Sequence, residues 1–290
     1  MSHIKTFVSN LNYGGLGNRI NTLVSDLMLY EKIYTSHPCL IYWPIIKDKY
    51  EDLFEPITDT TVIDMYNRKK HFVDAKVGET EQYMRNPNGF VILKSDIDKL
   101  YSIESYYRRF NGTIYYTYDR TPKYFIELYS KYLRMLVPKE DIRHTVDNYW
   151  KNVGYNERHV GVHIRQGDFN KHIDRKVDIK RFIKTMKEIL DDCPQTVFYL
   201  STDSEAIYKK IEHQFPEGKV ITYKHKQDTK EHSDFRTALI CLLILSKPKR
   251  LILTNFSTYS QLAWWFGGCE AKVDIITNEF QDTYEKNGVK

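Results

Sequence analysis

The chain has 290 residues, which is long for one hydrophobic core and suits two domains of roughly 100 to 200 residues each. Its 43 Lys and Arg against 38 Asp and Glu leave a net charge of +5, too small and too dispersed for a nucleic-acid-binding surface. We therefore expect no nucleic-acid partner. No apolar run approaches the roughly 18 residues of a membrane span, so we expect no membrane-spanning helix either.

The cysteines and the first residues favour a reducing compartment. The four cysteines lie far apart and form no C-x-x-C pair, which indicates neither a zinc ribbon nor a dense disulfide framework. The first residues lack the apolar core and cleavage site of a signal peptide. We therefore expect a cytoplasmic protein, in which the sequons at Asn111 and Asn255 stay unglycosylated because glycosylation needs a secretory route.

The chain opens with a predicted strand, a glycine-rich turn and a helix. Residues 6–11 read as the strand and residues 12–19 (NYGGLGNR) as the turn. The helix then repeats apolar residues at spacings of three and four, as a stripe that faces a sheet: Ile20, Leu23, Val24, Leu27 and Met28. Backbone N–H groups at the start of this helix make the turn a candidate anion site. Alternatively it is only a tight turn that needs glycine dihedrals, since it matches neither the dinucleotide fingerprint nor a P-loop.

The middle of the chain ends in two predicted helices and a domain boundary. Three stretches before them read as strands: residues 39–43, 90–93 and 113–118. Thr121-Pro122 is typical of a helix start. Pro138 opens a second helix, whose apolar residues are Ile142, Val146 and Trp150. Polar residues and a glycine then interrupt the pattern, so we place the boundary there, with domains 1–153 and 154–290.

Strands and helices alternate regularly in the second domain. The predicted strands are residues 160–164, 197–200, 220–223, 251–254 and 273–276. Between them lie segments with helical periodicity, including the almost uniformly apolar residues 235–245. This alternation predicts an α/β domain with a doubly wound parallel sheet.

Polar residues follow three of these strands, in the region where open α/β sheets bind their ligands. They are Arg165 with Asp168, Thr202 with Asp203, and Ser257 with Thr258. Each pair alone has a structural explanation as a turn, a helix cap or a loop. Together they offer a fixed cation, a carboxylate for a base or ribose, and hydroxyls with helix N–H groups for phosphate. The combination predicts a nucleoside diphosphate site.

Several of these segments resemble motifs of one enzyme superfamily. Residues 163–168 (HIRQGD) resemble the H-x-R-x-G-D motif of the fucosyltransferase superfamily, which includes the α-1,2-, α-1,6- and protein O-fucosyltransferases. Residues 14–18 (GGLGN) and 201–203 (STD) are similar to two motifs of the α-1,2 group. Residues 234–265 are similar to its buried helix, strand and S-T-F-S block, whereas residues 44–150 match only in outline.

The resemblance implies a GT-B fold, in which two Rossmann-like lobes face a cleft and the C-terminal lobe holds the sugar nucleotide. It assigns Arg165 to the β-phosphate of GDP-fucose and places Asn18 beside the reacting sugar, as the two catalytic residues. The donor-binding residues that it implies are Gly15, Gly17, His163, Asp203, Ser257, Thr258 and Tyr259. Asp203 would lie near the guanine and ribose. Gly167 and Asp168 would support the motif, and His163 would help to hold the arginine.

The chain departs from the family pattern at two positions that bear on the donor. Gln166 stands where many members carry a second basic residue, and Phe256 is inserted before Ser257. Asp96-Ile97-Asp98 has the D-x-D spelling of metal-dependent transferases, but two aspartates in a polar loop are common, so we predict no metal and no cofactor. The general base is not identified, because the sequence cannot place carboxylates such as Glu79, Glu81 and Glu104.

We therefore predict an inverting, metal-independent glycosyltransferase that moves fucose from GDP-fucose to a glycan hydroxyl. One alternative is the same fold with a different GDP-, UDP- or dTDP-linked sugar. Another is a non-catalytic glycan- or nucleic-acid-binding protein, which the 23 tyrosines and the slight positive charge would suit. The missing signal anchor suggests a bacterial or viral protein that acts on glycan precursors in the cytoplasm, while the sequence leaves the oligomeric state open.

Overall fold

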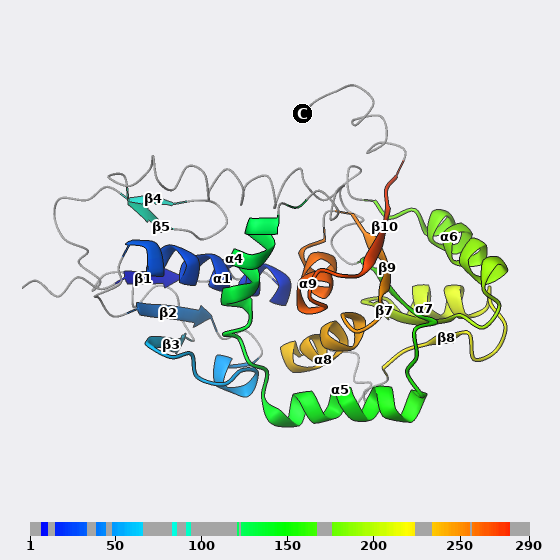
Figure 1. Ribbon diagram of the computed structural model, residues 1–290, viewed down its shortest axis with the longest axis horizontal. Coiled ribbons are helices and arrows are strands. Elements are labelled where there is room, and N and C mark those ends of the chain that lie inside the picture. The colour runs from blue at the N-terminus through cyan, green and yellow to red at the C-terminus, as the bar shows by residue number, and fades with distance from the viewer. Residues whose placement is uncertain are drawn as a thin grey trace, which may run out of the picture. The chain divides into compact units, whose positions relative to one another are not determined.

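The computed structural model describes most of the chain in segments. They are residues 7–10, 15–33, 39–44, 48–65, 83–85, 91–93, 121, 123–166, 176–223, 234–255 and 257–278. The chain divides into two compact units (Figure 1). Unit 1 comprises Met1–Arg109, Thr121–His144 and His232–Leu239, and unit 2 comprises Phe110–Arg120, Thr145–Glu231 and Ile240–Lys290.

Unit 1 holds a parallel sheet of three strands in the order β1-β2-β3. The strands are Phe7–Asn10, Cys39–Pro44 and Thr60–Met65. Helix α1, Leu16–Ile33, connects β1 to β2 and buries the predicted apolar stripe, including Ile20, Leu23, Val24 and Leu27. Strand, helix and parallel strand in this order form a βαβ unit, so the predicted opening of the chain is confirmed.

Two of the strands in unit 1 escaped prediction. Strand β3 lies at the edge of the sheet, where Thr61 is exposed and Val62 only half-buried, so its sequence shows no clear alternation. Strand β4, Tyr83–Arg85, pairs antiparallel with β5, Val91–Leu93, and only β5 was predicted. The predicted strand at residues 113–118 lies outside the described residues.

Among the described residues, the other helical elements that begin in unit 1 are η1 at Tyr50–Asp52, α4 at Lys123–Leu133, α5 at Glu140–Val153 and α8 at Phe235–Leu245. Helix α4 packs against α1 through polar contacts as well as apolar ones. The Tyr129 hydroxyl lies 2.5 Å from Oδ1 of Asn21, and the Tyr132 hydroxyl donates to Oε2 of Glu31 at 2.8 Å. The two predicted helices after Thr121 and Pro138 are thus present as α4 and α5.

The first turn of α8 is capped by carboxylates. Asp48 accepts hydrogen bonds from the backbone N–H groups of Phe235 and Arg236, at 2.5 and 3.3 Å. Asp234, immediately before the helix, accepts a further backbone N–H of the first turn at 2.6 Å. Because the first N–H groups of a helix lack intrahelical partners, these two side chains satisfy donors that would otherwise be buried unpaired.

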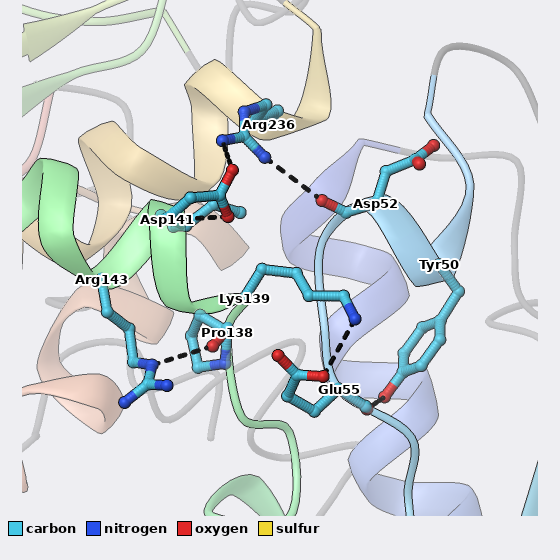
Figure 2. Close-up of polar contacts among 9 residues, drawn as sticks. Tyr50, Asp52, Glu55, Pro138, Lys139, Asp141, Arg143 and Arg236 are labelled. Atoms are coloured by element: carbon cyan, nitrogen blue, oxygen red, sulfur yellow. Dashed lines mark hydrogen bonds and ion pairs between the residues drawn. The ribbon is translucent and has the colours of Figure 1, made fainter.

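Ion pairs surround this helix start, as Figure 2 shows. The guanidinium of Arg236 pairs with the carboxylate of Asp141 in α5 and donates to the backbone carbonyl of Asp52 at 3.4 Å. Nearby, Nζ of Lys139 lies 2.9 Å from Oε2 of Glu55. The first turns of α5 and α8 are therefore linked to each other, and that of α8 to the end of η1, within unit 1.

Unit 2 holds a five-stranded parallel sheet in the order β10-β9-β6-β7-β8. In chain order the strands are β6 at His159–Ile164, β7 at Val197–Thr202, β8 at Val220–Ile221, β9 at Arg250–Thr254 and β10 at Lys272–Ile276. The helices that lie wholly in it are α6 at Ile179–Asp192, α7 at Glu205–Glu212 and α9 at Thr258–Phe266. The alternation predicted from residue 160 onward is confirmed.

Side chains of the central strand β6 alternate between two helical layers. Val162 and Ile164 belong to one core with residues of α6 and α7. On the opposite face, a Cβ at Gly161 would lie 3.1 Å from the backbone oxygen of Leu245 in α8, so glycine permits this close approach, and His163 contacts α9. The sheet therefore has helices on both faces, as a doubly wound domain requires.

The strand order indicates where a ligand would bind in unit 2. The chain passes outward from β6 to β7 and β8 and then returns to the other side of β6 with β9 and β10. Open α/β sheets bind ligands outside the carboxyl ends of their strands, at the point where the strand order reverses. In unit 2 that point lies between β6 and β9.

The sequence also predicts a domain boundary and the absence of a membrane-spanning helix. The boundary between residues 153 and 154, with an acceptor domain before it and a donor domain after it, stays a prediction. Within the described residues, no helix is both long and apolar enough to cross a membrane.

Candidate active site

Arg165 directly follows β6, and a buried threonine holds its backbone. Oγ1 of Thr254, the last residue of β9, accepts the N–H of Arg165 at 3.0 Å and donates to the carbonyl of His163 at 2.9 Å. Thr254 is 4% exposed, so this pair of bonds is shielded from water. The hydroxyl thereby locks the end of β6 to the end of β9 at the switch point.

Asp203, which follows β7, holds Arg165 and Gln166 from the other side. Its Oδ2 lies 2.7 Å from Nη1 of Arg165, and its Oδ1 accepts the backbone N–H of Gln166 at 2.8 Å. The side chain of Arg165 is 36% exposed and that of Asp203 is 28% exposed. The guanidinium is thus oriented by the protein and still accessible to a ligand.

The side chain of His163 packs against α9. Its Nδ1 lies 2.7 Å from Oγ of Ser260, and its ring lies 4.8 Å from the ring of Tyr259, centroid to centroid. Burial, together with the nearby charge of Arg165, lowers the pKa of His163 from 6.5 to about 3. A buried neutral imidazole bonded to α9 supports the strand that carries Arg165; a contact with the donor stays a prediction.

Helix α9 presents its N-terminus after β9, beside the strand that carries Arg165. Ser257 is its N-cap and accepts the N–H of Ser260 at 3.4 Å, while Thr258 is its first residue. The first turn of α9 holds no acidic residue, whereas α7, which follows β7, carries Glu205 in its first turn. Because a helix N-terminus favours anions, α9 suits a phosphate group better than α7 does.

Tyr259 connects α9 to β7. Burial raises the pKa of its hydroxyl well above the ordinary value, and the hydroxyl also bonds with Ser201 at the end of β7. The phenol therefore stays protonated at neutral pH, and its ring backs His163. In this structure Tyr259 supports the site from behind, and its predicted contact with the donor remains a prediction.

The glycine-rich turn of unit 1 is open at its described end. Gly15 is exposed, and a Cβ placed on it would meet no described atom within 4 Å. Its carbonyl accepts the N–H of Arg19, which makes it the residue before the helix. Asn18 is exposed and Gly17 is buried. The start of α1 is therefore approachable, as an anion site needs, but the roles of these residues stay predictions.

Some predicted groups lie outside the described residues. These are Gly14, Gly167, Asp168, Phe256, the Asp96-Ile97-Asp98 segment and the carboxylates Glu79, Glu81 and Glu104. Among the residues that the structure does describe, no group of three or more His, Cys, Asp and Glu side chains could hold a metal ion.

Sequence reasoning missed two residues that support the site in unit 2 and one buried arginine beside the glycine-rich turn of unit 1. Thr254 and Ser260 were read as parts of a strand and a helix, because their partners lie about ninety residues away in the chain. Arg19 is fully buried, with its guanidinium 5.2 Å from the ring of Trp43 and 4.6 Å from the ring of Phe235. The only feature of the sequence that could have indicated the burial of Arg19 is its position directly before Ile20, the first residue of the apolar stripe of α1.

Comparisons with known proteins bear on the fold. No protein-family model and no curated protein matches the chain. Among solved structures, the α-1,6-fucosyltransferase NodZ soaked with GDP-fucose is 14% identical over 90% of this chain and 92% of its own, with a TM-score of 0.53. NodZ from Bradyrhizobium is 14% identical, with coverages of 90% and 93% and a TM-score of 0.53. POFUT1 in complex with GDP-fucose is 10% identical over 95% of this chain and 98% of its own, with a TM-score of 0.55.

The chain has the fold of these fucosyltransferases. The predicted GT-B-like α/β fold is thereby confirmed. The motif resemblance to the superfamily is supported as far as the fold, and the special likeness to the α-1,2 group stays a prediction.

Proposed function

We propose that this protein is an inverting glycosyltransferase that moves fucose from GDP-fucose to a glycan hydroxyl without a metal ion. The observation that carries the proposal is the guanidinium of Arg165, held at the switch point between β6 and β9. The fold supports it, because solved structures of the same fold include fucosyltransferases with GDP-fucose.

The chemistry of transfer explains why a fixed cation is needed there. As the acceptor hydroxyl attacks the anomeric carbon, the bond to the nucleotide breaks and negative charge grows on the β-phosphate. Arg165 meets that charge with a planar fork of N–H donors that matches a phosphate. A preorganised donor of this kind contributes about 2.7 to 4 kcal/mol, or roughly a hundred- to thousandfold in rate.

The proposal assigns further donor contacts to other residues. Ser257, Thr258 and the N-terminus of α9 supply hydroxyls and backbone N–H groups for the diphosphate. Gly15 and Asn18 are assigned to the donor sugar by the motif resemblance alone. The acceptor is a glycan, and the reaction takes place in the cytoplasm. Asn255 is 3% exposed, which fits an unglycosylated sequon.

The proposal is tested by incubating the protein with a panel of nucleotide sugars and separating the released nucleotides. We expect GDP release from GDP-fucose that rises when a glycan acceptor is added and is unchanged by EDTA. The H1 coupling of the product should show an anomeric configuration opposite to that of the donor.

Other outcomes would replace the proposal. Turnover of a UDP- or dTDP-linked sugar without turnover of GDP-fucose would keep the fold and change the donor. Strongly salt-dependent binding to RNA or DNA, with no turnover of any donor, would indicate a binding protein.

A further inference from the structure

We propose that Asp203 is a positioning residue, which orients the guanidinium of Arg165 toward the leaving phosphate. The inference rests on the proposed function and assigns Asp203 a task different from contact with a base or ribose. It starts from the fact that both carboxylate oxygens of Asp203 bond to consecutive residues of one turn, Arg165 and Gln166.

The two bonds fix two different parts of that turn. The Oδ2 contact with Nη1 sets the direction of the Arg165 side chain, and the Oδ1 contact with the N–H of Gln166 sets the peptide that follows. Thr254, at the end of the neighbouring strand β9, accepts the backbone N–H of Arg165. The residue at the end of β6 is therefore held from β7 and from β9 at once.

A simpler role for Asp203 can be set aside. Its position before α7 would suit a helix cap, but the cap of α7 is Ser204, whose Oγ accepts the N–H of Ile207 at 3.3 Å. Asp203 instead turns its carboxylate toward β6. Its place after β7, the strand next to β6, gives it the reach for this contact.

Holding the arginine in advance has a clear benefit for catalysis. A guanidinium carries five N–H donors, so it can contact a carboxylate and a phosphate together. A long, partly exposed side chain loses rotamer freedom when it grips a ligand, and a partner that fixes it beforehand lowers this cost. Asp203 thus acts on the β-phosphate through Arg165, with no contact of its own to the reacting atoms.

The first test compares GDP with GMP as ligands of the wild type and of Asp203→Asn. The amide oxygen of the variant can still accept the N–H of Gln166, while the charge that orients Arg165 is lost. We expect GDP affinity to fall roughly 10- to 100-fold, the range for residues that orient metal ligands from behind, and GMP affinity to stay the same. In turnover, kcat should fall more than KM rises.

Equal losses for GDP and GMP would overturn the inference, because a base or ribose contact, or general damage, would weaken both ligands alike. Asp274→Asn is the matched control. Asp274 is 25% exposed and lies 2.8 Å from Nε of Arg250 at the opposite end of β9, so its loss should leave both affinities unchanged.

A second test needs no ligand. We expect the Nε–H NMR signal of Arg165, assigned by its loss in Arg165→Lys, to report a restricted side chain in the wild type and a mobile one in Asp203→Asn. Equal mobility in both would overturn the inference. If mobility rises as expected but the wild type binds no GDP, the positioning contact stands and the proposed function fails.

Discussion

His163 near the end of β6 and Arg165 directly after the strand are two residues apart, yet their side chains do different things. The imidazole enters the buried layer under α9, and the guanidinium stays partly exposed at the end of the strand. A motif histidine near a substrate site is a common choice for the general base. Here its burial and its bond to Ser260 favour a structural role, in which it fixes the strand that delivers Arg165.

That role predicts a pH dependence of stability. In the unfolded chain His163 takes up a proton below pH 6.5, whereas in the folded protein its pKa is about 3. The unfolded state therefore binds more protons between these values, so the stability due to neutral His163 is present above pH 6.5 and lost as the pH falls toward 3, by up to about 1.4 kcal/mol per pH unit.

Urea unfolding of the wild type and of His163→Gln, from about pH 7.5 to about pH 4.5, measures this effect. The stability advantage of the wild type should shrink as the pH falls. If the two curves stay parallel, the pKa of His163 is the same in the folded and unfolded states, and the account of its role is wrong.

The sequence predicts the site residues better than their contacts. The sequence predicts Arg165, Asp203 and Ser257 at the carboxyl ends of three strands of one sheet. The structure places them after β6, β7 and β9, which are adjacent in the sheet. The pairing of Arg165 with Asp203 could not be predicted, because it depends on the order of the strands. The contacts of Thr254 with Arg165 and His163 could not be predicted for the same reason.

At the scale of elements, α8 shows how a strongly apolar helix is given a defined start. Its residues 235–245 were predicted from composition alone, but composition does not reveal what satisfies its first N–H groups. Asp48 does so, although it lies 187 positions from Phe235 in the sequence. Burial raises the pKa of Asp48, while the two N–H bonds act in the opposite direction.

We expect Asp48→Ala to lower the free energy of unfolding by about 0.5 to 2 kcal/mol, the range for loss of a helix-capping side chain. Asp48→Asn keeps an acceptor oxygen at the same position and should recover most of the loss. Urea unfolding of the three proteins decides between these outcomes. A neutral alanine variant, or equal losses in both, would show that the bonds to α8 are not what stabilises this junction.

At the scale of the whole molecule, the two units differ in how much of their fold the sequence predicts. In unit 2 every strand is followed or preceded by a well-patterned segment, so the alternation alone indicates a parallel sheet. In unit 1 the edge strand β3 is half-exposed and β4 is three residues long, so neither has a periodic signal. The reversal of strand order after β8 is a property of the assembled sheet and has no local signature.

The fold and the site support the proposed function in different ways. At 10 to 14% identity, the likeness to solved fucosyltransferases concerns the path of the backbone. The proposed chemistry instead depends on Arg165, whose backbone is held by Thr254 and whose guanidinium is held by Asp203.

The most direct test of that claim is the rate of GDP release from GDP-fucose by Arg165→Lys. Lysine keeps the charge and loses the planar fork, so we predict a loss of roughly a hundredfold or more. The matched control is Arg250→Lys, in which a 33% exposed arginine paired with Asp274 is changed at the other end of the sheet, and its rate should stay near that of the wild type. A lysine variant at position 165 that releases GDP as fast as the wild type would contradict the account.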